Sequence, residues 1–111
     1  MELSASMVAK LGDLNDRFEE VSALLSDAET MADREKFTAL SKEFAEIEPV
    51  VLCYQKVTVL KDSLKENTLL LDDEDPDLRE LAEQEIAEAK DQMSVLFAQL
   101  QTLLLPRDPN D

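Results

Sequence analysis

An acidic run at residues 72–77 is the part of this sequence best suited to chemistry. Three of its carboxylates alternate like the first ligands of a calcium-binding EF-hand loop: Asp73, Asp75 and Asp77. Such a loop also needs a glycine at its sixth position and a bidentate glutamate at its twelfth, where this chain has Leu78 and Gln84. We therefore interpret the acids as groups that stabilise the positive end of a helix, and we expect no metal site.

Other reactive groups are scarce. The chain has no histidine, which removes the usual general base and the most common zinc ligand. Cys53 lies beside a helical apolar pattern, which favours a small packed hydrophobe over a nucleophile. Gly12 alone cannot form a phosphate-binding glycine loop. We expect a protein that is not an enzyme and binds no cofactor, and we assign no residue to catalysis.

The charge of the chain bears on its partners. Twenty-six acidic residues against eleven basic ones give a formal net charge of −15, so nucleic acid phosphates should repel it. Residues 72–85 hold eight acids and Arg79 as the single base, a surface that could dock a basic partner. We expect no direct binding of nucleic acid by this chain.

A cytoplasmic protein without membrane contact is expected. One cysteine cannot form an internal disulfide, and Met1-Glu2-Leu3 lacks the basic and then apolar pattern of a signal peptide. No apolar stretch approaches the roughly 20 residues that span a bilayer.

Three apolar seams with alternating spacings of three and four predict the helices that position these residues. The first seam comprises Met7, Leu11, Leu14, Phe18, Val21 and Leu25. Asp13 and Arg17 should form an ion pair on its exposed side. A loop is expected around residues 26–31, where the periodicity lapses.

The second seam keeps its phase across a proline. It comprises Phe37, Leu40, Phe44, Ile47, Val51 and Tyr54, and continues through Val57, Leu60 and Leu64. Asp33 is the expected cap. Pro49 would clash with the carbonyl of Ala45, so we predict one helix kinked near Pro49 rather than two separate helices.

The third helix should begin at Asp75 and Pro76, an acceptor for free N–H groups followed by a residue with its φ already set. Its seam comprises Leu78, Ala82, Ile86, Ala89, Met93, Leu96, Leu100 and Leu103. Pro106 should end it, and residues 106–111 should form an exit linker to further domains.

These elements predict an all-α fold, an elongated antiparallel bundle or coiled coil of three long helices within a domain of residues 1–105. The aromatic residues should supply the bulkiest contacts: Phe18, Phe37, Phe44, Tyr54 and Phe97. Replacing Phe44, expected to be fully buried, should cost about 3–5 kcal/mol.

Several stretches also resemble, in order and approximate spacing, the N-terminal helical domain of the bacterial class I peptide chain release factors. They are Met7-Val8-Ala9-Lys10-Leu11, Arg17-Phe18-Glu19-Glu20-Val21, Leu24-Leu25-Ser26-Asp27, Asp33-Arg34-Glu35-Lys36-Phe37 and Ala39-Leu40-Ser41-Lys42-Glu43-Phe44. The closing segment at residues 103–111, LLLPRDPND, is the most specific and is closer to the type that reads UAA and UAG.

The resemblance implies translation termination, in which the full-length factor hydrolyses peptidyl-tRNA on the ribosome with a Gly-Gly-Gln loop and a stop-codon-reading tripeptide. Neither motif is in this chain. The resemblance further implies a regulatory domain directed toward the ribosomal stalk base, with the class II release factor GTPase and the glutamine methyltransferase as partners. A free-standing acidic coiled-coil adaptor or scaffold is the alternative, since the seams alone would fit it.

Overall fold

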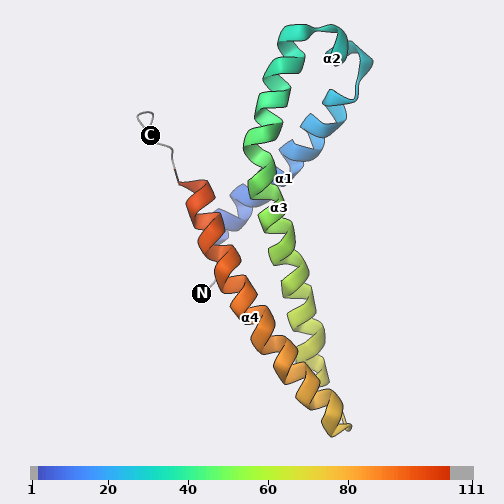
Figure 1. Cartoon of the computed structure of the whole chain (residues 1–111), viewed down its shortest axis with the longest axis vertical. Coiled ribbons are helices and arrows are strands. Elements are labelled where there is room, and N and C mark those ends of the chain that lie inside the picture. The colour runs from blue at the N-terminus through green and yellow to red at the C-terminus, as the bar shows by residue number, and fades with distance from the viewer. Residues whose placement is uncertain (1–2, 106–111) are drawn as a thin grey trace. The chain divides into compact units, whose positions relative to one another are not determined.

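The computed structural model describes residues 3–105, and every regular element in that range is a helix. The elements are α1 (Ala5–Leu25), α2 (Ala28–Ala32), α3 (Arg34–Leu70) and α4 (Pro76–Leu104), as Figure 1 shows. The all-α prediction is confirmed, and the three long helices lie where the seams place them. The expected linker at residues 106–111 is outside the described residues. None of the described helices combines the length and apolar character that crossing a bilayer requires.

The chain divides into two compact units, and their boundary falls inside α3, between Leu52 and Cys53. The described parts are residues 3–52, here the N-terminal unit, and residues 53–105, here the C-terminal unit. Each unit contains one helical hairpin: α1 with the first part of α3, and the second part of α3 with α4 (Figure 1).

In the N-terminal unit, α1 begins after the N-cap residue Ser4, and its predicted apolar seam is the buried side of the helix. The hydroxyl of Ser4 accepts a hydrogen bond of 3.2 Å from the backbone N–H of Met7. Leu11 and Val21 are buried, and the other four seam residues are half-buried. The spacing of threes and fours therefore identified the buried face of this helix correctly.

The loop expected at residues 26–31 is wrong for residues 28–31, which belong to the short helix α2, Ala28–Ala32. The carboxylate of Asp27 accepts a hydrogen bond of 3.3 Å from the N–H of Glu29 and so caps the first turn. Thr30, within this turn, is fully buried. A single turn lacks the repeated apolar spacing on which the sequence prediction relied.

One helix, α3, continues through Pro49, which confirms the prediction of a single helix over two. Asp33 caps it as expected, since its carboxylate accepts a hydrogen bond of 3.2 Å from the N–H of Lys36. Pro49 lacks the backbone N–H that would donate to the carbonyl of Ala45. Both residues are exposed. The kink at Pro49 stays a prediction.

The C-terminal unit has a core of small and aliphatic side chains around one phenylalanine. Its buried residues are Cys53, Val57, Ala82, Ala89, Phe97 and Leu100. The two end residues of the predicted α4 seam, Leu78 and Leu103, are 39% and 38% exposed. Between them the seam alternates between buried residues (Ala82, Ala89 and Leu100) and half-buried ones (Ile86, Met93 and Leu96). The helix itself starts at Pro76 and ends at Leu104, as the Asp75–Pro76 pair and Pro106 predict.

Candidate partner-binding surface

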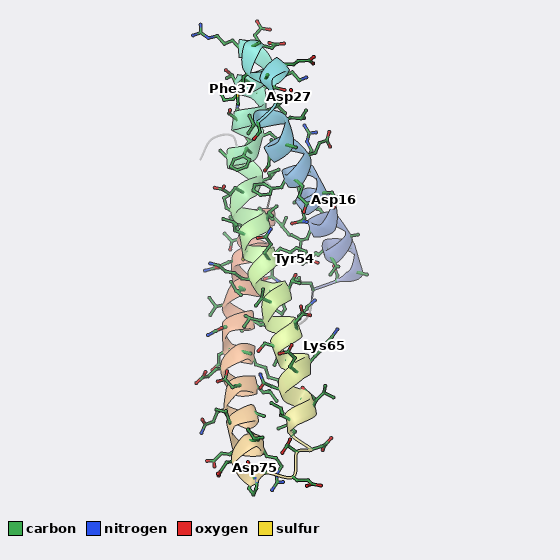
Figure 2. The ribbon with its side chains drawn as sticks, turned by 90° about the vertical axis from the view of Figure 1, so that its right-hand side faces the viewer. Asp16, Asp27, Phe37, Tyr54, Lys65 and Asp75 are labelled. Atoms are coloured by element: carbon green, nitrogen blue, oxygen red, sulfur yellow. The ribbon has the colours of Figure 1, made fainter. Side chains whose placement is uncertain are left out.

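The acidic turn between α3 and α4 uses its carboxylates to bind the backbone. The Asp73 carboxylate accepts from the N–H of Asp75, and the Asp75 carboxylate accepts from the N–H of Asp77, each at 2.9 Å. Figure 2 shows Asp75 at this turn, where α4 begins. The predicted capping role of Asp75 is thereby confirmed, because its side chain satisfies a donor that the helix leaves free.

Arg79 holds the same turn from within α4. Its Nη1 donates to the carbonyl oxygens of Asp73 at 2.7 Å and of Glu74 at 3.2 Å. A cation in the first turn of a helix opposes the helix dipole, so these two hydrogen bonds, not the dipole, explain its position.

The alternation that resembled calcium ligands does not converge on a common point. Among residues 3–105, no group of three His, Cys, Asp or Glu side chains is placed to hold a metal ion. Two of the three alternating carboxylates, those of Asp73 and Asp75, already face backbone N–H groups. The geometry of the turn is that of a capped helix start.

Cys53 lies in the interior of the C-terminal unit. Its Sγ is 3.5 Å from the carbonyl oxygen of Leu96 and 3.8 Å from Oε1 of Gln99, two acceptors on α4. Burial raises the pKa of the thiol above its ordinary value, and the nearby Lys56 opposes this only in part. The burial of Cys53 agrees with the packing role that the sequence indicated.

Arg17 links the two helices of the N-terminal unit. Its Nε and Nη2 each donate to a carboxylate oxygen of Glu43 at 2.6 Å, and its Nη1 lies 3.2 Å from Glu20. The expected ion pair between Arg17 and Asp13 is wrong. The guanidinium of Arg17 instead makes two parallel hydrogen bonds to the carboxylate of Glu43 on α3, a geometry that strengthens an ion pair. These hydrogen bonds hold the pKa of Glu43 below its usual value, although partial burial acts in the opposite direction.

Two aromatic rings stack beside this ion pair. The ring centroids of Phe18 and Phe44 are 4.9 Å apart, with 27° between their planes. Phe44 is half-buried, which corrects the expectation that it is fully buried. Phe37 lies on the first part of α3, as Figure 2 shows. It is 39% exposed. Of the four phenylalanines, Phe97 alone is buried, at 4% exposed.

The exposed face of α4 combines acids with apolar side chains. Leu81 and Val95 are 52% and 58% exposed, and Glu85 and Glu88 are exposed between them. Neither glutamate belongs to an ion pair among the described residues. This face therefore presents negative charge and exposed apolar surface side by side.

The sequence reading missed this face because it followed one seam per helix. The signal was available: Leu81 and Val95 each stand one residue before a seam position, at a spacing of two heptads. The Arg17–Glu43 pair had no such signal, because its partners are far apart in the sequence.

The chain was compared with models of known protein families. The family model described as the PCRF domain matches residues 14–111, which is most of the sequence.

Proposed function

Because the chain belongs to the PCRF domain family, that of the N-terminal domain of class I peptide chain release factors, we propose that it is the regulatory arm of a translation termination factor of the UAA- and UAG-reading type. The family match supports a role in termination on the ribosome. The codon preference rests on the closing segment at residues 103–111.

We propose that the arm works through protein partners, namely the class II release factor GTPase, ribosomal proteins at the stalk base and the glutamine methyltransferase. The acidic, unpaired face of α4 is the observation that supports this division of labour. Negative charge repels rRNA phosphates and attracts basic protein surfaces, and such complementarity chiefly sets the rate of encounter.

Decoding and hydrolysis belong, in this proposal, to further domains of the same factor in the cytoplasm. The 111 residues hold one glycine and therefore no Gly-Gly-Gln sequence. The reading frame tests this directly: continuation beyond Asp111 into a Gly-Gly-Gln domain supports it, while a stop after Asp111 supports the coiled-coil adaptor.

Peptide release from stop-codon-programmed ribosomes tests the regulatory role. The factor with and without residues 1–111 is compared, each in the presence and absence of the class II GTPase. We expect the shortened factor to release peptide but to lose its normal response to the GTPase. Unaltered release together with an unaltered GTPase response would contradict the proposal.

A further inference from the structure

A second stripe runs along α4 beside its buried seam. Its positions each precede a seam residue by one: Leu81, Glu85, Glu88, Gln92, Val95 and Gln99. Successive helical residues are about 100° apart, so this stripe is a separate face with the same spacing of threes and fours. The spacing is the one that a second helix needs to pack along it.

The part of the stripe from Leu81 to Val95 is apolar at its two ends and acidic between them, whereas Gln99 beyond it lies against Cys53 on α3. Leu81 and Val95 are more than half exposed, and Leu78 borders the stripe with 39% of its side chain exposed. Leu81 and Val95 are fourteen positions apart, which corresponds to about 21 Å along the axis. Glu85 and Glu88 lie between them without an ion-pair partner among the described residues.

We infer that this stripe docks an amphipathic helix of a partner protein that carries apolar residues at its two ends and Lys or Arg in its middle turns. Leu81 and Val95 would bury apolar surface against those ends, and Glu85 and Glu88 would attract the central cations. An RNA strand would instead bring phosphates to the glutamates. The identity of the partner as part of the termination machinery rests on the proposed function; the chemistry of the stripe does not.

Anisotropy of a labelled helical peptide of about 20 residues, with leucines at its ends and lysines in its middle, measures the docking. A matched peptide carries glutamates in place of the lysines. We expect the lysine peptide to bind, and Leu81→Ser with Val95→Ser to weaken it about tenfold or more. Val59→Ser with Leu69→Ser is the matched control on α3, where these residues are 66% and 78% exposed. Equal weakening by this control would overturn the inference.

A charge swap gives the second arm of the experiment. Glu85→Lys with Glu88→Lys should reverse the preference, so that the glutamate peptide binds and the lysine peptide is lost. Asp62→Lys with Glu66→Lys, an exposed pair on α3, should leave the preference unchanged. Circular dichroism is the check that all variants keep their helices. Binding without preference between the peptides would overturn the inference, and since no ribosome is present, that failure is distinct from failure of the release assay.

Discussion

The two units hold their helices together by different interactions. In the N-terminal unit, a stacked aromatic pair and a forked ion pair connect α1 to α3, through Phe18 with Phe44 and Arg17 with Glu43. In the C-terminal unit, small and aliphatic side chains fill the interior around Phe97. In the turn before α4, the charged side chains of Asp73, Asp75 and Arg79 form hydrogen bonds to backbone atoms.

This difference indicates what each unit should be sensitive to. Specific side-chain pairs respond to pH and to the removal of one partner, whereas a close-packed interior responds to changes in volume. Perturbing one unit at a time therefore tests whether the two are stabilised as described.

The largest effect should come from Phe97→Ala. The side chain is 4% exposed, so its removal leaves a cavity and should cost about 3–5 kcal/mol of unfolding free energy. Urea unfolding followed by circular dichroism measures the loss, and hydrogen exchange should show it first in residues 53–105. Val95→Ala, at an exposed site on the same helix, should change stability by less than about 0.5 kcal/mol. Equal losses from both variants would contradict this packing.

Phe44→Ala should cost less, about 2 kcal/mol, because the ring is half-buried. A double-mutant cycle with Phe18→Ala isolates the stack, for which we expect a coupling of about 1 kcal/mol. Additive effects of the two substitutions would show that the rings do not support each other.

Asp75→Ala should destabilise the start of α4 by about 1 kcal/mol, since it removes the side-chain acceptor for the N–H of Asp77. Asp72→Ala is the control, because it removes an acid from the same run without removing a cap. Thermal unfolding of both variants separates capping from net charge: equal shifts in Tm would point to charge alone.

Gly12→Ala should stabilise the N-terminal unit by about 0.5–1 kcal/mol. The residue lies inside α1, its φ is not positive, and an added Cβ would meet no atom within 4 Å. A loss of stability in urea unfolding would mean that the open space beside Gly12 is needed.

The smallest effect is expected from acid, because the Arg17–Glu43 pair is about one-third exposed and water screens it. The folded-state pKa of Glu43 is lowered, so its contribution is present above the unfolded value of about 4.3 and is lost as the pH falls through the folded value. Hydrogen exchange in residues 3–52 should rise in that range. Glu43→Gln should flatten this dependence, and an unchanged pH profile would contradict the role of the pair.

Periodicity predicted most of the fold because long helices repeat their buried face many times. The seams located α1, α3 and α4, and local signals located their starts at Asp33 and Asp75. These features depend on neighbours within one turn, which a sequence shows directly.

Features that depend on distant residues were less accessible. Arg17 pairs with Glu43 on another helix, and Phe44 is only half-buried. The boundary between the two units falls after Leu52, inside the continuous helix α3. The exposed stripe on α4 has the same origin, since exposure depends on which of two neighbouring faces a hairpin covers. Charge and spacing alone could nominate Leu81 and Val95 but could not decide that they remain exposed.

The central claim is that this acidic domain contacts proteins rather than rRNA. Photo-cross-linking tests it most directly. A photoreactive residue replaces Leu81 in the factor bound to stop-codon-programmed ribosomes, and Leu69 on α3 serves as the comparison site. We predict cross-links from position 81 to a protein, with the attachment in a segment rich in Lys or Arg. Cross-links from position 81 to rRNA would contradict the account.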